Sequence, residues 1–132
     1  MYKIFVIDDC PLNLVLAKII IKKHGFFTAT CFSEAQLALD YIACNQNDSI
    51  NLPDVILLDL NMPVMDGWQF LAKFEEQLPL VKVIGVYMLS SSTDLRDVQR
   101  AKQYQSVKEF FTKPLSTEML NEIMISSLAT AS

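Results

Sequence analysis

The chain has 132 residues and a formal net charge of −4, and 52% of its residues are hydrophobic while 20% are charged. This length and composition predict one folded domain with a proper core and argue against disorder. The acidic balance argues against a nucleic-acid partner, which requires a basic face, and no apolar run reaches the roughly 18 to 20 residues of a membrane span.

Strand-like and helix-like stretches alternate along the chain. The strand-like runs are short and rich in apolar, aromatic or β-branched residues. The helix-like stretches are longer and carry start and stop signals. In chain order, the predicted elements are strand 2–7, helix 11–24, strand 27–32, helix 33–45, strand 55–58, helix 66–77, strand 83–89, helix 92–104, strand 109–112 and helix 116–127.

Several helix boundaries depend on specific residues. Pro11 suits the first turn of a helix, and Gly25 suits the residue after its last turn. Capping boxes, in which Ser or Asp precedes Gln by three residues, predict helix starts at Ser33 and Asp66. The remaining predicted caps are Ser92 or Thr93 for the fourth helix and Ser116 for the fifth.

Five strand–helix units predict an α/β fold, a (βα)5 doubly wound sheet of five parallel strands with helices on both faces. In such open sheets, ligands bind beyond the carboxyl ends of the strands. The residues that directly follow the strands are therefore the candidates for a functional site.

Charged and hydroxyl residues follow four of the predicted strands. They are Asp8 and Asp9, then Asp59, then Ser90 and Ser91, and finally Lys113. One acid at a strand end is usually a solvated turn residue, but three acids from two strands with a lysine from another favour a functional site. Crowded carboxylates raise one another's pKa and need a cation. Oxygen ligands without His or Cys are typical of a Mg²⁺ site.

Asp59 ends the apolar run 55–58, where an unpaired charge is costly. A metal ion alone would balance the acids, so the additional charge of Lys113 indicates that a second anion binds. Mg²⁺, a lysine and a hydroxyl around one carboxylate are suited to receiving a phosphoryl group. We therefore predict that Asp59 is a nucleophile and that Lys113 and Ser90 assist it.

Four stretches match a known family: VIDD at 6–9, LLDLNMPVMDG at 57–67, MLSSS at 88–92 and FFTKP at 110–114. With these stretches the chain resembles the receiver domains of response regulators, which have the flavodoxin-like, CheY-like fold. The resemblance covers residue 2 to about residue 127. It implies a receiver domain over 1–128, followed by a short tail at 129–132.

The resemblance also implies a role for each matching residue. Asp59 is expected to be the phosphoacceptor and also a metal ligand, Asp9 a direct Mg²⁺ ligand and Asp8 a ligand that acts through water. The backbone carbonyl of Asn61 is expected to be a further metal ligand. Lys113 is expected to pair with the bound phosphoryl group.

The switch residues of the family are harder to place. A gap-free count back from Lys113 gives Ser91 as the switch hydroxyl, whereas the first hydroxyl after the apolar run is Ser90. We favour Ser90, with one extra residue accommodated in the following helix or loop. The aromatic switch position is Phe110, which has no hydroxyl, so it would act by steric contact alone. The Lys113–Pro114 peptide bond is expected to be cis.

The first predicted helix presents two faces. Leu16, Ala17, Ile20 and His24 are predicted to lie on the inward face. The opposite face is predicted to carry Val15, Lys18 and Lys22, flanked by Leu14 and Ile19. Apolar residues grouped beside the acidic pocket could seat a partner helix.

The implied function is that of a stand-alone signalling switch. A histidine kinase or a histidine phosphotransfer protein would supply the phosphoryl group, and the phosphorylated form would bind an unidentified protein target. The alternative is a phosphorelay carrier, which passes the phosphoryl group to a histidine of another protein and has no allosteric target. We expect no enzyme activity beyond weak self-catalysed phosphoryl transfer and hydrolysis. A haloacid-dehalogenase-type phosphatase is discounted, because Asp59 lies on the third strand and lacks the D-x-D pattern.

The cysteines and the amino terminus predict the compartment. Cys10, Cys31 and Cys44 have no C-x-x-C spacing, so we expect free thiols rather than a disulfide framework or a zinc site. Two acids follow the first apolar run too early for a signal peptide. We therefore expect a cytoplasmic protein without a membrane partner.

Overall fold

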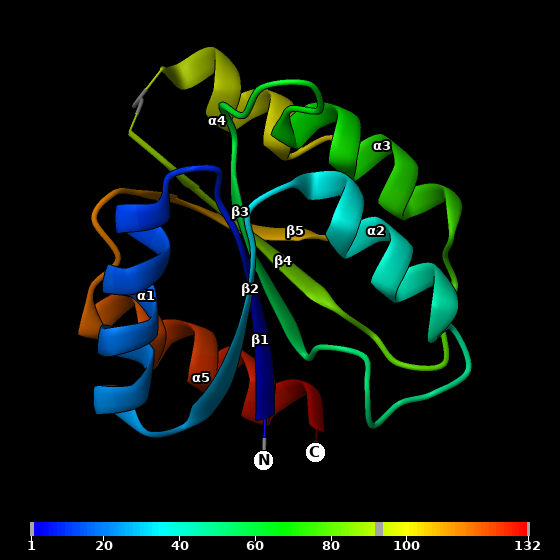
Figure 1. Ribbon diagram of the computed structural model, residues 1–132, viewed down its shortest axis with the longest axis horizontal. Coiled ribbons are helices and arrows are strands. Elements are labelled where there is room, and N and C mark those ends of the chain that lie inside the picture. The colour runs from blue at the N-terminus through cyan, green and yellow to red at the C-terminus, as the bar shows by residue number, and fades with distance from the viewer. Residues whose placement is uncertain (1, 92–93, 132) are drawn as a thin grey trace.

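The computed structural model describes residues 2–91 and 94–131, and strands and helices alternate along them (Figure 1). The elements are β1 (Tyr2–Ile7), α1 (Pro11–His24), β2 (Phe27–Phe32), α2 (Ala35–Cys44), β3 (Val55–Asp59), α3 (Gly67–Glu76), β4 (Gly85–Ser90), α4 (Leu95–Ala101), β5 (Val107–Thr112) and α5 (Thr117–Ala131). Each predicted strand and helix is present, and the differences lie at the boundaries.

Five strands form one parallel sheet in the order β2-β1-β3-β4-β5 within the described residues. Helices α1 and α5 cover one face, and α2, α3 and α4 cover the other (Figure 1). This arrangement confirms the predicted (βα)5 doubly wound fold. Because the strands are parallel, their carboxyl ends lie together at one edge of the sheet, which we call the carboxyl edge.

The central strand β3 is buried on both faces. Ile56 and Leu58 pack in the layer beneath α2 and α3, while Val55 and Leu57 pack toward α1 and α5. A strand that is apolar on both faces is typical of a parallel sheet covered by helices on each side. The run therefore holds Asp59, its last residue, at the carboxyl edge.

The capping boxes predicted for two helices have different outcomes. At the start of α3, the Asp66 carboxylate accepts from the Gln69 N–H at 2.9 Å, and the Gln69 side chain accepts from the Asp66 N–H at 3.0 Å. This box is confirmed. The box predicted at Ser33 is wrong, because Glu34 is the N-cap of α2 and its side chain makes no capping hydrogen bond.

The last two helices also differ from their predicted bounds. The N-cap of α4 is Asp94, whose carboxylate accepts from the Arg96 N–H at 2.9 Å. The caps predicted at residues 92 and 93 lie outside the part of the chain that the structure describes. Ser116 caps α5 as predicted, because its hydroxyl accepts from the Met119 N–H at 3.2 Å. Helix α5 then continues to Ala131, through residues predicted to be a tail.

The Lys113–Pro114 peptide bond is cis, as predicted, and the Leu78–Pro79 bond is also cis. The three cysteines are free thiols, which agrees with the prediction that they form no disulfide. No helix within residues 2–91 and 94–131 is long and apolar enough to span a membrane.

Candidate functional site

Three carboxylates meet at the carboxyl edge. Asp8 follows β1 and is 4% exposed, Asp59 ends β3 and is 7% exposed, and Asp9 is exposed. One carboxylate oxygen from each of them lies within 4.8 Å of the others. The cause is the sheet register, since β1 and β3 are paired with Ile7 opposite Leu58. The structure thus brings together the three acids that sequence analysis placed at this edge.

The ammonium group of Lys113 bridges the two buried carboxylates. Its Nζ lies 2.8 Å from Asp8 Oδ2 and 3.2 Å from Asp59 Oδ1. The Lys113 N–H also donates to the Ser90 carbonyl at 2.8 Å. This backbone bond fixes the end of β5 beside the end of β4, so the lysine is positioned by the sheet as well as by its charge.

Asp8 accepts hydrogen bonds from three donors. They are the Cys10 N–H at 2.9 Å, Asn13 Nδ2 at 3.3 Å and Lys113 Nζ at 2.8 Å. Asn13 was not among the site residues predicted from the sequence. The signal that could have found it is its place in the first turn of α1, where an amide side chain can reach back to the acids that precede the helix.

The site carries more negative than positive charge. Burial raises the pKa of Asp59 above its ordinary value of 3.8, the charge of Asp8 raises it further, and Lys113 offsets these effects only in part. Burial lowers the pKa of Lys113, but its hydrogen bonds and charge interactions with Asp8 and Asp59 outweigh burial and raise that pKa overall. Two buried carboxylates share one ammonium group, and a cation would relieve the imbalance.

The residues present fit a hard divalent cation. The atoms that the side chains of the cluster offer to a metal ion are all carboxylate oxygens, and such a set of ligand atoms suits Mg²⁺. Within residues 2–91 and 94–131, the Asp9 side chain makes no hydrogen bond or ion pair, whereas the Asp8 oxygens already have three donors. Asp9 is therefore available to bind a metal directly. Asn61 is exposed, and its N–H donates to Asp59; its carbonyl as a metal ligand stays a prediction.

Ser90 and Ser91 lie in different environments. Ser90 is the last residue of β4, is fully buried and lies opposite Thr112 of β5, whereas Ser91 is exposed. Burial at the strand end agrees with the choice of Ser90, whose part in switching stays a prediction. Phe110 is half-buried against the core layer beneath α2 and α3, where it can act only through packing.

Close packing joins Gly67 to the end of β3. A Cβ on Gly67 would lie 2.9 Å from the Asp59 carbonyl oxygen and 3.0 Å from Leu60 Cα. The Gly67 N–H donates to the Leu60 carbonyl at 2.9 Å. The first residue of α3 is therefore held against the backbone of the residue that carries the candidate nucleophile.

Residues 4–125 match the family described as the response regulator receiver domain. The chain belongs to this family. The receiver domain is 34% identical over 87 residues to the probable methanogenesis regulatory protein FilR2 of Methanothrix harundinacea, which is 66% of this chain and 55% of that protein. The chain thus spans about half the length of FilR2.

The receiver domain is also similar to proteins of nearly the same length. It is 27% identical over 124 residues to the chemotaxis protein CheY of Listeria monocytogenes, which is 94% of this chain and 96% of that protein. Among solved structures, a two component response regulator from Cytophaga hutchinsonii has 25% identity and a TM-score of 0.89 over 98% of both chains. These similarities support a CheY-like receiver domain.

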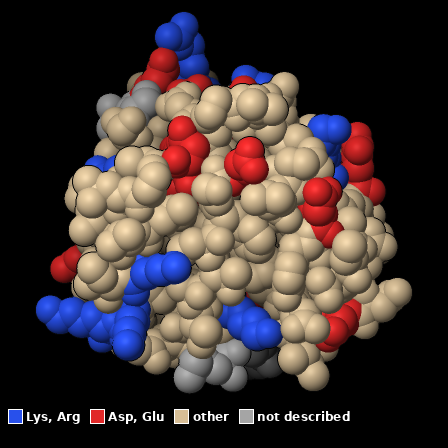
Figure 2. All heavy atoms as spheres, viewed as in Figure 1, with Lys and Arg blue, Asp and Glu red and all other residues tan. Residues whose placement is uncertain are grey.

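The outer surface of α1 in the receiver domain is apolar. The inward position predicted for Leu16 is wrong, because Leu16 is 53% exposed. Ala17 and Ile21 are the buried residues of α1. The face that the helix turns toward the sheet is therefore displaced by about one residue from the predicted face. The exposed apolar residues, which we call the α1 stripe, are Leu12, Val15, Leu16 and Ile19. The helix contains no acid, and basic side chains gather over its carboxyl-terminal half (Figure 2).

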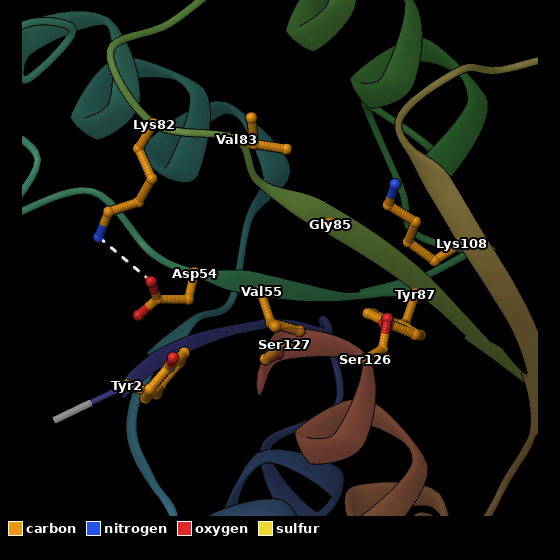
Figure 3. A pocket seen from close by; sticks show the side chains of 10 residues that line it. All are labelled: Tyr2, Asp54, Val55, Lys82, Val83, Gly85, Tyr87, Lys108, Ser126 and Ser127. Atoms are coloured by element: carbon orange, nitrogen blue, oxygen red, sulfur yellow. Dashed lines mark ion pairs between the residues drawn. The ribbon is translucent and has the colours of Figure 1, made fainter. Parts of the chain in front are cut away.

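A cavity of about 310 Å³ opens at the opposite, amino edge of the receiver domain (Figure 3). Gly85 of β4 and Ser126 of α5 are among the residues that line it. Four of the polar side chains that line it pair with one another, since Lys82 lies 3.4 Å from Asp54 and the Tyr87 hydroxyl bonds Ser126. The cavity therefore gives no independent sign of a ligand.

Proposed function

We propose that this receiver domain is a phosphorylation switch. Asp59 accepts a phosphoryl group from a histidine kinase or a histidine phosphotransfer protein in the presence of Mg²⁺, and the phosphorylated domain then binds a protein target. The observation that carries the proposal is the geometry at Asp59, which has Lys113 at 3.2 Å and two further acids in reach. Family membership supports the donor, since receiver domains work with histidine kinases in two-component systems.

Asp59 is the nucleophile of the transfer. One carboxylate oxygen forms a bond to phosphorus as the bond from phosphorus to the donor imidazole nitrogen breaks, and the imidazole keeps the electron pair. Mg²⁺ held by Asp8 and Asp9 supplies charge neutralisation for the phosphoryl group. Lys113 turns from Asp8 toward a phosphoryl oxygen, because charge-assisted hydrogen bonds to phosphate are strong.

Phosphorylation changes the conformation through Lys113 and Ser90. Lys113 directly follows β5, so a new bond to the phosphoryl group draws that strand end toward the site. The Ser90 hydroxyl donates a hydrogen bond to the same group, and Phe110 responds through packing. The phosphoryl group need favour the active state by only a few kcal/mol to shift the population. The target binds the face formed by α4, β5 and α5.

The phosphodonor docks on the α1 stripe, which begins beside Asp9. The apolar residues of the stripe are 53 to 63% exposed, and they share α1 with Lys18 and Lys22. The helix contains no acidic residue. This combination suits an amphipathic helix with acidic residues at its border. Glutamate in place of Leu16 should slow transfer from the donor and leave phosphorylation by acetyl phosphate unchanged. Equal slowing with both donors would contradict this docking site.

The receiver domain is not an enzyme with a separate substrate, and it catalyses only weak phosphoryl transfer and hydrolysis at its own aspartate. We place it in the cytoplasm, which its free thiols support. In the described part of the chain, no feature favours the relay carrier over the switch.

The proposal is tested by incubating the chain with acetyl phosphate and Mg²⁺ and measuring its intact mass. We expect one phosphoryl group on the wild type and none on Asp59→Asn. Asp66→Asn is the matched control, because Asp66 caps α3 outside the acidic cluster. Phosphoryl uptake by Asp59→Asn would remove Asp59 from the role.

A further inference from the structure

Three side chains join the start of α3 to the end of α4, and we call them the Trp68 stack. The rings of Trp68 and Tyr104 are stacked, with centroids 5.9 Å apart and planes at 21°. The guanidinium carbon of Arg100 lies 4.4 Å from the centroid of the Trp68 ring, within the range of a cation–π contact. Trp68 is 8% exposed and Arg100 is exposed. The stack therefore runs from the core to the surface of α4.

The inner end of the stack is attached to the strand that carries Asp59. Trp68 directly follows Gly67, whose N–H donates to the Leu60 carbonyl at 2.9 Å. A Cβ on Gly67 would lie 2.9 Å from the Asp59 carbonyl oxygen, so the two backbones are in close contact. Packing this close transmits displacement, because protein interiors have little free space. A shift of the Asp59 backbone therefore moves Trp68.

The outer end of the stack lies at the end of α4. This helix has seven residues, and a helix of that length depends on tertiary contacts for its stability. Arg100 lies in its last turn, and Tyr104 follows three residues after its end. Ala101 is buried in the same core layer as Trp68. The stack is therefore positioned to fix where the end of α4 lies.

We propose that the Trp68 stack couples phosphorylation of Asp59 to the position of α4. The inference rests on the proposed function of Asp59 and adds a route to the target face that does not pass through Ser90 or Phe110. Such a route matters in this chain, because Phe110 has no hydroxyl to bond with. Coupling of this kind requires an element with two arrangements that both sites influence, and the stack, formed or released, is that element.

The test uses the full chain with Mg²⁺ and beryllofluoride, a mimic of the phosphoryl group. Amide chemical shifts of residues 95–101 report on α4, and the fluorescence of Trp68 reports on the stack. Arg100→Gln and Tyr104→Leu should still bind beryllofluoride but lose most of the α4 shift change. Arg96→Gln is the matched control, because Arg96 lies one turn earlier and pairs with Asp94 at 2.9 Å. A full α4 response in both stack variants would overturn the proposal.

A second measurement needs no phosphoryl group. The reporter is hydrogen exchange at the Gly67 amide, which donates to Leu60 beside Asp59. Loss of a cation–π contact at an exposed site should speed this exchange by roughly 2- to 5-fold in Arg100→Gln. Unchanged Gly67 exchange in both stack variants overturns the coupling. A different result separates the two proposals. If Gly67 exchanges faster in the stack variants but the wild-type chain takes up no phosphoryl group, the coupling is supported and the proposed function of Asp59 is overturned.

Discussion

Asp8 and Asp9 are adjacent in sequence and have opposite environments. Asp8 is buried, and its oxygens accept from Cys10, Asn13 and Lys113. Asp9 is exposed and makes no side-chain hydrogen bond among the described residues. A carboxylate already supplied with donors loses them when it binds a metal directly, whereas a free one loses only water. We therefore propose that the two acids have different tasks and that Asp9 is the direct metal ligand.

Replacing Asp9 by alanine should weaken Mg²⁺ or Mn²⁺ binding by more than about tenfold, the scale seen when a supporting ligand is lost. Asp66→Ala should leave metal affinity unchanged and instead lower stability by about 0.5 to 2 kcal/mol through loss of the α3 cap. Metal titration and urea unfolding of the two variants separate these effects. Equal losses of metal affinity would refute the division between site and cap.

Ser90 and Ser91 can be distinguished by their burial. Ser90→Ala should reduce the beryllofluoride-induced shift changes over residues 94–110, because it removes one hydrogen bond to the phosphoryl group. Lys113→Ala should reduce them further and still permit some phosphorylation, since Mg²⁺ supplies most of the charge compensation. Ser91 is exposed, so Ser91→Ala should respond like the wild type. If Ser91→Ala loses the beryllofluoride-induced shift changes while Ser90→Ala keeps them, the switch hydroxyl is that of Ser91.

At the scale of elements, the turn from β3 to α3 determines the geometry of the site. The Asp66 capping box starts α3, and Gly67 lies against the backbone of Asp59 and Leu60. Because Gly67 has no side chain, the first turn of α3 can pack directly against the end of the strand that carries Asp59. The same contact carries the inner end of the Trp68 stack.

Gly67→Ala should destabilise the domain by about 1 to 3 kcal/mol, the usual cost of overpacking, despite the higher helix propensity of alanine. It should also lower phosphoryl uptake, because the Asp59 backbone has to shift. Gly85→Ala is the matched control, since its nearest contact is the flexible Lys108 side chain at 3.3 Å. Urea unfolding of both variants measures the difference in stability. Similar losses of stability would show that the close contact at Gly67 is not the cause of the destabilisation.

At the scale of the whole molecule, the site reduces the stability of the fold. Burial, and then the charge of Asp8, raise the pKa of Asp59 in the folded chain above its unfolded value near 3.8. A carboxyl with a raised pKa contributes stability that is complete below the unfolded pKa and is lost as pH rises through the folded pKa. When its carboxyl is ionised, Asp59 therefore disfavours folding until a cation binds.

Asp59→Asn should unfold at a higher urea concentration than the wild type at pH 7 in the absence of divalent metal. The difference should shrink as the pH falls through the raised pKa of Asp59 toward 3.8, because the wild-type carboxyl becomes neutral. Asp40→Asn, at an exposed carboxylate on α2, is the control and should show no such trend. A less stable Asp59→Asn at pH 7 would contradict the charge imbalance.

The fold class and the members of the acidic cluster were predictable from the amino-acid sequence. Strand-length apolar runs alternate with helix signals, and this order predicts a parallel sheet with only a handful of possible strand orders. In a parallel sheet of any such order, Asp8, Asp59 and Lys113 lie at the same edge, because each of them comes at or after the carboxyl end of a strand. The local box at Asp66 was also predictable, because both partners lie within one turn of helix.

Features that depend on how the elements are oriented relative to one another could be seen only in the folded chain. The rotation of α1, which exposes Leu16, is set by packing against the sheet and not by the weak apolar pattern of the helix. The bond from Asn13 to Asp8 and the contact of Arg100 with Trp68 join different elements. Sequence periodicity fixes which residues share a face, but the direction of that face depends on the neighbours it packs against.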